Sequence, residues 1–384
     1  MKASRSYLDW AATAIPDEHP GDENKTAYGN PSSPHLEGRM AKEALENSRS
    51  ICAGVLKVSQ KELFFTSGGT ESNALVLYSL LTRKGQGRLL YSGIEHPSVR
   101  ENCLKLKKLG LLTGEIYVEK DGRVSEKSLS KALEKYTDTR FIAIMGVNNE
   151  TGSLMDLKSL VSIARSHQAK TGIPIHIHSD LVQAAGKLHL DISKWDLDSA
   201  SISSHKLGGP RGIGLLYLKK PLEVLYSGGE QEGRIRPGTE NTPGAHSLAI
   251  VLARRANEET IDLEGEKARE RFKYLIGRLK KMDRCSLIPE DREDDDPRFS
   301  PWILQARIRG LPGAVVVRAL DDMGIAVSTG SACSSNSPER PVLEAMGLDN
   351  RARSEGIRIS QGWSTDIRDL DALLEGIKKA ASSL

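Results

Sequence analysis

The feature that most constrains this chain is a regular alternation of strand-like and helix-like segments between residues 37 and 220. The strand-like segments are short apolar or alternating runs, and the segments between them repeat apolar residues at helical spacing. This alternation favours a parallel or mostly parallel sheet that helices cover on both faces. We expect strands at 62–66, 88–92, 141–147, 173–178, 199–203 and 213–218, and helices at 37–57, 71–81, 99–109 and 157–170.

The pattern changes near Thr242-Pro243-Gly244. Residues 245–279 predict one long or broken helix, and short strands follow near 286–288 and 303–309. The charged run 290–296 separates two of these strands and is typical of a solvated loop. We therefore expect a second, smaller α+β domain after the first.

Length and charge narrow the classes of protein that fit. The 384 residues exceed one average domain. The 54 basic and 51 acidic residues leave a net charge of +3, which excludes a strongly basic nucleic-acid binder and a protein held to membranes by charge. The chain contains no run of about 18 apolar residues and no apolar signal region before Tyr7. We therefore expect a cytoplasmic protein that neither spans a membrane nor binds nucleic acid directly.

The segment from Thr66 to Asn73, Thr-Ser-Gly-Gly-Thr-Glu-Ser-Asn, lies between a predicted strand and a predicted helix. Gly68 and Gly69 let backbone N–H groups approach an anion, and Thr70 lies where the helix dipole favours a phosphate. The segment is neither a Walker motif nor a dinucleotide fingerprint. Taken alone, it fits a tight turn with a helix cap better than a phosphate site.

Polar residues also end the strand predicted at 173–178. His176, His178 and Asp180 would share one face of that strand. They could form a metal site, because imidazoles and carboxylates are ordinary ligands. They could equally place one carboxylate, Asp180, at the carboxyl edge of the sheet, where the sites of α/β proteins lie.

Lys206 follows the next predicted strand directly and precedes the turn Gly208-Gly209-Pro210. Most lysines are solvated surface charges. A lysine held at a sheet edge can instead form a Schiff base if burial makes its amine nucleophilic. This segment alone leaves both interpretations open.

The four cysteines, Cys52, Cys103, Cys285 and Cys333, are widely spaced and form no CxxC pair. A disulfide framework or a cysteine zinc site is therefore not expected. Cys333 differs from the others because small or loop-forming residues surround it on both sides. Such a setting suits an exposed thiolate as well as a packing role, whereas for the other three we expect packing roles.

Three of these features meet the needs of one cofactor. Pyridoxal phosphate requires a loop for its phosphate, a carboxylate for its pyridine nitrogen and a lysine for its aldehyde carbon. The loop at Gly69 and Thr70, the carboxylate of Asp180 and the amine of Lys206 are these three groups. Together they predict a pyridoxal phosphate site and no resident metal.

Nine short motifs follow one another along nearly the whole chain: Tyr7-Leu8-Asp9-Trp10-Ala11-Ala12-Thr13, Gly29-Asn30-Pro31-Ser32-Ser33, Phe65-Thr66-Ser67-Gly68-Gly69-Thr70-Glu71-Ser72, Glu95-His96, Val147-Asn148-Asn149-Glu150-Thr151-Gly152, Asp180-Leu181-Val182-Gln183, Ser203-Ser204-His205-Lys206, Arg236-Pro237-Gly238-Thr239 and Gly330-Ser331-Ala332-Cys333. In this order they resemble the NifS/IscS-like cysteine desulfurases of the class V aminotransferase family. The resemblance implies the α/β fold of the fold-type I pyridoxal phosphate transferases. It implies a large domain at 15–259 with a mostly parallel seven-stranded sheet, and a smaller α+β domain of 1–14 and 260–384 that carries the cysteine loop.

The resemblance also implies roles around the cofactor. Lys206 would form the Schiff base and carry protons, Asp180 would pair with the pyridine nitrogen, and His96 would stack on the ring and help to move protons. The remaining cofactor contacts would be Asn149 and Gln183 near the phenolic oxygen, and Gly69, Thr70, Ser203 and His205 around the phosphate.

The implied substrate is L-cysteine, which would leave as L-alanine after its sulfur passes to Cys333 as a persulfide. Arg358 would bind the substrate carboxylate, and Asn30 would also contact the substrate. Thr239 would reach the phosphate site of the neighbouring subunit, which implies a homodimer. We expect an acceptor protein to take the sulfur on towards iron–sulfur clusters, thio-cofactors or tRNA.

Two departures from the family pattern affect the entrance and floor of the site. The segment between Thr13 and Tyr28 is shorter than expected and carries prolines where the family has a helix. Leu181 and Val182 are bulkier than the family's residues after the aspartate. Neither departure removes a group with an implied catalytic role.

Four alternatives remain open at this point. Selenocysteine lyase and cysteine sulfinate desulfinase share the fold and the cofactor groups. An aminotransferase of the same fold would leave Cys333 unexplained. A metal-dependent hydrolase using His176, His178 and Asp180 would leave both Lys206 and Cys333 unexplained. A non-catalytic scaffold would not need these groups together.

Overall fold

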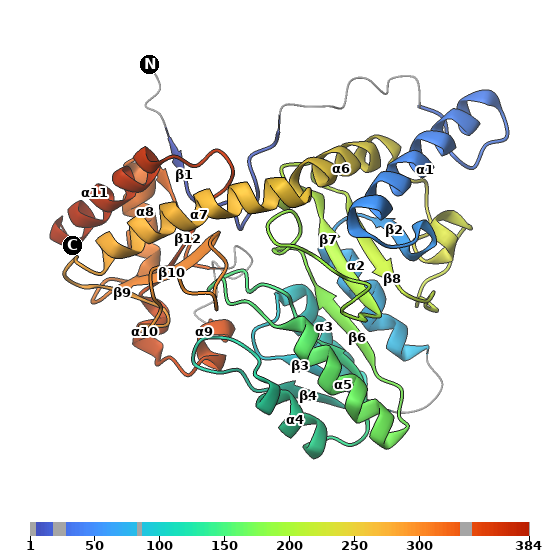
Figure 1. The fold of residues 1–384 in the computed structure, drawn as a ribbon, viewed down its shortest axis with the longest axis horizontal. Coiled ribbons are helices and arrows are strands. Elements are labelled where there is room, and N and C mark those ends of the chain that lie inside the picture. Colours follow the sequence, from blue (N-terminus) through green and yellow to red (C-terminus); the bar gives the residue numbers. More distant parts are fainter. Residues whose placement is uncertain (1–4, 18–27, 83–86, 331–339, 384) are drawn as a thin grey trace.

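The computed structural model describes residues 5–17, 28–82, 87–330 and 340–383 (Figure 1). Its largest sheet has seven strands in the order β2-β8-β7-β6-β5-β3-β4. β8 pairs antiparallel with both neighbours, and every other pair is parallel. The predicted mostly parallel seven-stranded sheet is therefore confirmed. Its strands are β2 (Leu63–Thr66), β3 (Arg88–Ser92), β4 (Thr113–Ile116), β5 (Thr139–Ala143), β6 (His176–Asp180), β7 (Ser199–Ser203) and β8 (Gly214–Leu218).

Helices cover both faces of this sheet, as the alternation predicted. Successive strand residues point to opposite faces, so Leu90 and Ile142 join one core whereas Leu89 and Phe141 join another. The first core includes residues of α1 (Leu36–Leu56), α4 (Glu126–Lys135), α5 (Leu157–Thr171) and α6 (Thr242–Arg255). The second includes residues of α2 (Gly69–Tyr78) and α3 (Pro97–Lys108).

A third core gathers Leu8 with apolar residues between Phe272 and Ile377. It packs around a three-stranded antiparallel sheet, β12-β10-β9, and a parallel pair, β1-β11. Figure 1 shows α7 extending from the end of α6 into this part of the molecule. The elements are β1 (Ser6–Tyr7), α7 (Glu258–Leu279), β9 (Cys285–Leu287), β10 (Ile303–Ile308), α8 (Gly313–Asp322), β11 (Ile325–Ala326), α9 (Pro341–Ala345), α10 (Asn350–Ser354), β12 (Gly356–Ser360) and α11 (Ile367–Ser383). The domain boundaries at 14 and 259 stay a prediction.

Four short 3₁₀ helices complete the described elements: η2 (Gln60–Glu62), η3 (Ser79–Leu81), η4 (Ser204–Lys206) and η5 (Gln231–Arg234). Glu232 of η5 is buried and accepts two hydrogen bonds of 2.7 Å from the Arg49 guanidinium. It also accepts the Phe65 N–H over 2.7 Å. One carboxylate therefore ties η5 to α1 and β2.

Two of the expected strands have the wrong bounds, and the strand expected at 173–178 is β6, which spans His176–Asp180. The strand expected at 141–147 is β5, which ends at Ala143, because the buried residues after it form a loop across the sheet edge. The long or broken helix expected at 245–279 is a broken one, because α6 ends at Arg255 and α7 begins at Glu258. Asn257 starts α7 by accepting the Thr260 N–H, and this capping favours a new helix over a continuous one.

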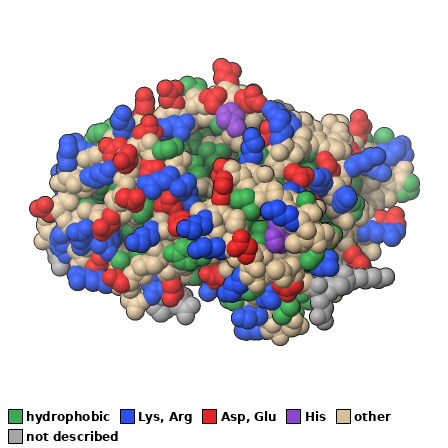
Figure 2. Space-filling model, turned by 60° about the horizontal axis from the view of Figure 1, so that its bottom comes forward, with side chains coloured by type: hydrophobic (Ala, Val, Ile, Leu, Met, Phe, Trp, Pro, Cys, Tyr) green, Lys and Arg blue, Asp and Glu red, His purple; other side chains and the backbone are tan. Residues whose placement is uncertain are grey.

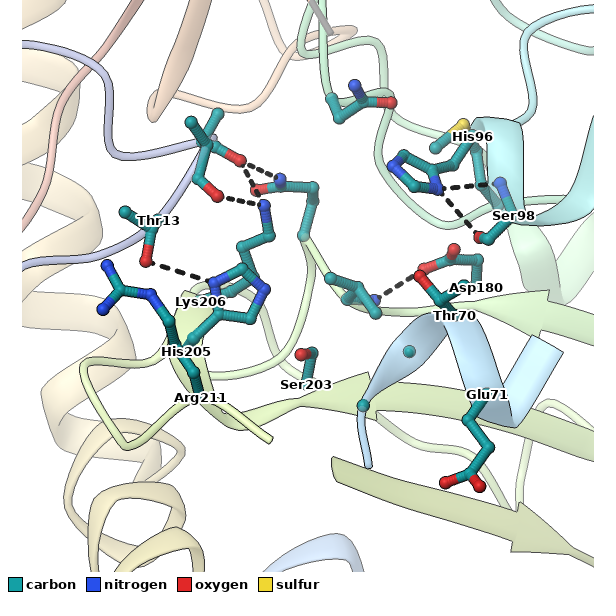
Figure 3. Close-up of a pocket in the computed structure, with 18 of the residues that line it drawn as sticks. Thr13, Thr70, Glu71, His96, Ser98, Asp180, Ser203, His205, Lys206 and Arg211 are labelled. Atoms are coloured by element: carbon teal, nitrogen blue, oxygen red, sulfur yellow. Dashed lines mark hydrogen bonds between the residues drawn. The ribbon is translucent and has the colours of Figure 1, made fainter. Parts of the chain in front are cut away.

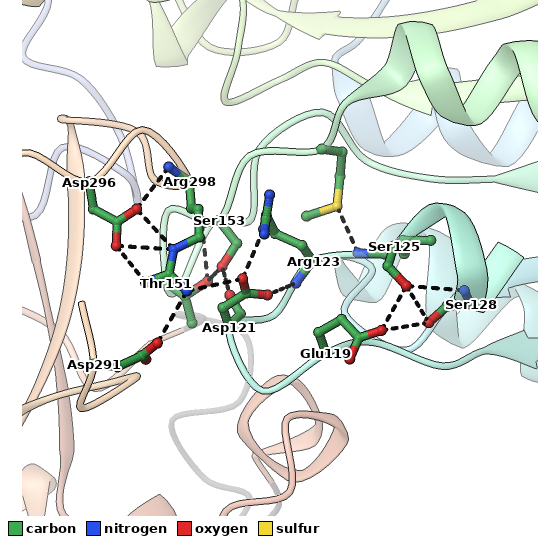
Figure 4. Close-up of polar contacts among 12 residues, drawn as sticks. Glu119, Asp121, Arg123, Ser125, Ser128, Thr151, Ser153, Asp291, Asp296 and Arg298 are labelled. Atoms are coloured by element: carbon green, nitrogen blue, oxygen red, sulfur yellow. Dashed lines mark hydrogen bonds and ion pairs between the residues drawn. The ribbon is translucent and has the colours of Figure 1, made fainter. Parts of the chain in front are cut away.

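The charged run 290–296 is a loop, but it is not simply solvated. Arg292 is buried and donates to the carbonyls of Thr151 and Ile303 over 3.0 and 3.2 Å. Burial lowers the pKa of Arg292 to about 9. Nearby, Arg298 forms ion pairs with Asp296 at 2.7 Å and with Asp121 at 3.5 Å (Figure 4). The loop therefore anchors the smaller part of the molecule to turns of the large sheet.

The surface carries charges of both signs. Figure 2 shows Lys and Arg side chains interspersed with Asp and Glu side chains over the visible face. This distribution agrees with the small net charge of +3. Among the described residues, no helix is long and apolar enough to cross a membrane.

Candidate active site

A cavity of about 430 Å³ opens at the carboxyl edge of the large sheet. β2, β6 and β7 all end at this edge, because β2 and β7 are each antiparallel to β8 and β6 is parallel to β7. Figure 3 shows the side chains that point into it. The cavity brings together ten residues proposed from the sequence: Gly69, Thr70, His96, Asn149, Asp180, Gln183, Ser203, His205, Lys206 and Arg358.

The start of α2 forms one wall. Gly68 has a φ of 147°, a conformation that favours glycine, and it turns the chain from β2 into the helix. A Cβ added to Gly69 would lie 2.6 Å from Val182 Cγ2, so glycine is the residue that fits here. Thr70 and Ser203 flank this wall, with Arg211 also lining the cavity. Helix N–H groups, hydroxyls and a guanidinium suit a phosphate.

Lys206 ends η4, directly after β7. Its Nζ donates to the carbonyls of Ala11 and Ala12 over 2.6 and 2.7 Å. The neighbouring His205 Nδ1 lies 3.1 Å from Thr13 Oγ1. Burial, together with the charges of Lys206 and Arg211, lowers the pKa of His205 to about 4. His205 is therefore neutral at pH 7 beside the lysine amine.

Asp180 is the last residue of β6 and is buried. Its Oδ1 accepts the Val182 N–H over 3.0 Å, and its Oδ2 accepts the Asn73 amide over 2.8 Å. His96 lies across the cavity at the start of α3, where its Nδ1 accepts the Ser98 N–H over 3.1 Å. Burial lowers the pKa of His96, an effect that Asp180 opposes and Lys206 adds to. A carboxylate and a neutral imidazole thus both face the cavity.

Arg358 comes from β12 and reaches the cavity from the smaller sheet. It is 1% exposed, and its Nη2 pairs with Asp9 Oδ1 at 2.7 Å. Its Nη1 donates to the Asn149 carbonyl over 2.9 Å. Its Nε has no hydrogen-bond partner among the described residues. The binding of a substrate carboxylate by Arg358 stays a prediction, and Asp9 is the group such a carboxylate would compete with.

The cavity also contains polar groups that fit pyridoxal phosphate. The buried Asn149 Oδ1 has no hydrogen-bond partner among the described residues. Gln183 Nε2 donates to the Ala11 carbonyl over 2.9 Å, on the same oxygen that Lys206 contacts. An anion wall, a buried carboxylate and a lysine amine therefore line one cavity, together with an acceptor that lacks a donor.

Two predicted site residues that the structure describes do not line this cavity. The side chains of Asn30 and Thr239 are exposed and do not line it. Cys333 lies outside the described residues, as do residues 18–27 of the short segment after Thr13. Ser328, five residues before Cys333, forms an isolated antiparallel bridge with Arg358. The chain leading to Cys333 therefore starts beside a residue of the cavity.

The other cysteines lie where packing roles were expected. Cys52 is buried in α1 and Cys103 is buried in α3, whereas Cys285 is partly buried in β9. Burial raises the pKa of Cys52 to about 12 and that of Cys285 to about 11. Each of these thiols is therefore protonated at neutral pH.

His176, His178 and Asp180 share one face of β6, but they do not converge on a common point. Ser199 Oγ lies between the two imidazoles, 2.8 Å from each. Asn73 lies between His178 and Asp180, 2.8 Å from each. Hydrogen-bonding side chains thus occupy the spaces where a metal ion would bind.

Two polar side chains of the lining were not singled out from the sequence. Ser98 follows His96 by two residues and contacts it, and Arg211 lies in the turn after Lys206. Arg211 had a usable signal, because a cation in a glycine-rich turn beside an anion site is chemically suited to a phosphate. Ser98 had no such signal, because in the sequence it resembles any serine at the start of a helix.

Comparisons with known proteins extend over nearly the whole chain. The family described as aminotransferase class-V matches residues 6–373. A cysteine desulfurase IscS from Dictyoglomus turgidum is 33% identical over 388 residues, which cover 98% of this chain and 95% of the relative. A solved structure named NIFS-like protein superposes with a TM-score of 0.89 at 30% identity, covering 99% of this chain and 100% of the other. Another, named SspA in complex with cysteine, has a TM-score of 0.77 at 27% identity and covers 93% and 98% of the two chains.

Proposed function

The chain belongs to the class V aminotransferase family, with the NifS/IscS-like cysteine desulfurases, and from this premise we propose that it is a pyridoxal phosphate-dependent enzyme that converts L-cysteine to L-alanine. The observation that carries the proposal is the meeting of Gly69, Asp180 and Lys206 in one cavity. These groups supply an anion wall, a carboxylate and an amine. The cofactor, when bound, supplies an electron sink for the substrate's α-carbon.

The chain's own residues divide the remaining work. Lys206 Nζ holds the cofactor and then accepts the proton from the substrate's α-carbon. Asp180 holds a proton on the pyridine nitrogen, and Arg358 orients the substrate carboxylate. Thr70, Ser203, His205 and Arg211 hold the phosphate.

Sulfur transfer uses Cys333. Its thiolate forms an S–S bond with the substrate sulfur while the Cβ–S bond of L-cysteine breaks. L-Cysteine and the Cys333 thiol thus become L-alanine and a Cys333 persulfide, with no external oxidant. The persulfide then passes its outer sulfur to an acceptor protein in iron–sulfur cluster, thio-cofactor or tRNA biosynthesis.

The proposal includes a cytoplasmic homodimer. Thr239 is exposed and would contribute to the neighbouring subunit's site, which suits a residue that its own cavity does not use. Arg236, three residues earlier, pairs with Glu71 of α2 at 3.4 Å, so the segment that carries Thr239 is anchored beside the anion wall. Sedimentation should give a mass near twice 42.0 kDa, and a monomer at all concentrations would contradict this part.

The test combines absorption with product analysis. The purified protein should show the visible band of lysine-bound pyridoxal phosphate, and L-cysteine with a reductant should release sulfide and alanine in equal amounts. Cys333→Ala should keep the band and lose sulfur transfer, whereas Lys206→Ala should lose the band. If alanine is released only from selenocysteine or cysteine sulfinate, that compound is the substrate in place of L-cysteine. An unchanged band in Lys206→Ala would overturn the role of the lysine.

A further inference from the structure

Asn73, in the second turn of α2, is a buried branch point between two residues of the cavity. Its side chain is fully buried, and both hydrogens of its amide are used. Nδ2 donates to Asp180 Oδ2 and to Ser98 Oγ, each over 2.8 Å. Its Oδ1 lies 2.8 Å from His178 Nε2. One side chain therefore contacts Asp180 directly and, at the same time, the Ser98 hydroxyl that contacts His96.

The directions of these hydrogen bonds follow from the chemistry of the groups. An amide oxygen can only accept, so His178 Nε2 carries the hydrogen and His178 Nδ1 is the acceptor. Ser199 Oγ, 2.8 Å from that Nδ1, must then donate to it and accept from His176 Nε2, also at 2.8 Å. Burial lowers the pKa of His178 to about 3, which agrees with a neutral ring.

The second branch reaches His96. Ser98 Oγ accepts from Asn73, so its own hydrogen is free to point at His96 Nδ1, 2.8 Å away. The Ser98 N–H donates to the same nitrogen over 3.1 Å. His96 therefore carries its hydrogen on Nε2, on the side away from Ser98.

We propose that Asn73, oriented by His178, is a positioning residue that holds the Asp180 carboxylate and, through Ser98, the His96 ring for the cofactor. The reverse amide orientation would place Oδ1 against the Asp180 carboxylate, and the His178 N–H prevents it. Ser199 in turn keeps His178 in the required tautomer. The inference rests on the proposed function only in that the cavity holds pyridoxal phosphate.

Cofactor affinity tests the Asp180 branch. Asn73→Ala removes a hydrogen bond to a charged group, so the dissociation constant for pyridoxal phosphate should rise about 10- to 100-fold. The pH dependence of the bound cofactor's visible absorption should shift as well. Asn102→Ala is the matched control, because that amide joins Tyr78 and the Ser98 carbonyl over 2.8 and 2.7 Å without touching Asp180. It should leave both the affinity and the pH dependence unchanged.

A pair of His178 variants separates positioning from packing. His178→Gln keeps an N–H that can reach Asn73 and should bind the cofactor within about threefold of the parent, whereas His178→Phe fills the space without a donor and should match Asn73→Ala. Ring ¹⁵N chemical shifts in the full-length protein should show His178 neutral and protonated on Nε2. If Asn73→Ala does not fold, the His178 pair and Ser199→Ala carry the test.

The outcomes distinguish this inference from the proposed function. Equal affinities for His178→Gln and His178→Phe, or parent-like affinity in Asn73→Ala, would overturn the positioning role while the parent protein still binds pyridoxal phosphate. A His178 ring protonated on Nδ1 would also overturn it. If the parent protein binds the cofactor but has no cysteine desulfurase activity, only the proposed reaction is contradicted.

Discussion

At the scale of single residues, Lys187 shows how strongly burial acts near the cavity. Its side chain is buried, and its Nζ donates to Gln183 Oε1 over 3.3 Å. Burial, with the nearby charges of Lys206 and Arg358, lowers its pKa to about 7. The Lys187 amine, whose ordinary pKa is 10.5, is therefore about half neutral at pH 7. Its charged form costs stability, because the unfolded chain can hydrate it.

Lys187→Met should raise the stability of the cofactor-free protein at pH 7 by about 3 to 5 kcal/mol. Loss of the hydrogen bond to Gln183 reduces this gain. Between pH 7 and 8.5 the unfolded lysine keeps its proton while the folded one loses it, so the parent's stability should rise by about 1 to 2 kcal/mol. The variant should lack this rise. Urea midpoints at several pH values measure the difference, and parallel profiles for the two proteins would contradict the lowered pKa of Lys187.

Sequence reasoning found the residues whose chemistry can be read locally. Asp180 ends β6 and Lys206 lies three residues after the end of β7, so the predicted sheet already placed both at one edge. It assigned no role to Asn73, because the contacts that matter join Asn73 to Asp180 across more than a hundred positions. Asp9 as the partner of Arg358 was missed for the same reason, since their pairing spans nearly the whole chain.

At the scale of elements, the start of α2 depends on a fit between two loops. Gly69 in this helix faces Val182 in the turn after β6. Val182 was noted from the sequence as bulkier than the family's residue. The structure shows what accommodates it, namely a glycine whose missing Cβ leaves room for Val182 Cγ2.

Gly69→Ala should therefore weaken pyridoxal phosphate binding, because overpacking costs about 1 to 3 kcal/mol. Gly69→Ala with Val182→Ala should recover most of the loss, since the contacting methyl group is gone. Gly54→Ala in α1 is the matched control, as a Cβ there would contact nothing within 4 Å. It should stabilise the protein by about 0.5 to 1 kcal/mol. A double variant as weak as Gly69→Ala would show that Val182 is not the obstacle.

The elements that sequence reasoning left unassigned include β4 and α4, which contain few apolar residues. β4 has the sequence Thr-Gly-Glu-Ile and lies at the edge of the sheet. Of its four residues, Ile116 alone is buried. α4 contains two serines and five charged residues, and only Leu129, Ala132 and Leu133 join the core. β5 was placed too late because the loop after it is as buried as the strand. Apolar periodicity indicates which residues are buried. It therefore misplaces an element where buried residues continue beyond the end of the strand or helix.

At the scale of the whole molecule, the cavity joins both sheets and concentrates positive charge. Lys206 and Arg211 come from the large sheet's loops, and Arg358 comes from β12. Burial lowers the pKa values of His205 and Lys187, and nearby cations of this set lower them further. A bound phosphate would offset this repulsion.

Pyridoxal phosphate at a hundredfold excess over its dissociation constant should stabilise the protein by about 2.7 kcal/mol. At a fixed cofactor concentration the gain should shrink as salt rises, because screening weakens the attraction of the phosphate. Pyridoxal without the phosphate is the matched control ligand and should stabilise less at every salt concentration. Equal effects of the two ligands in a thermal melt would show that the charges of the cavity do not contribute.

The clustering of cations at the junction of the two sheets reaches beyond catalysis. The cofactor-free protein should be less stable than the cofactor-bound protein. It should therefore be degraded more readily when pyridoxal phosphate is scarce, because proteases act on the unfolded fraction. We therefore expect the abundance of this protein in the cell to follow the supply of vitamin B6, from which the cofactor is made.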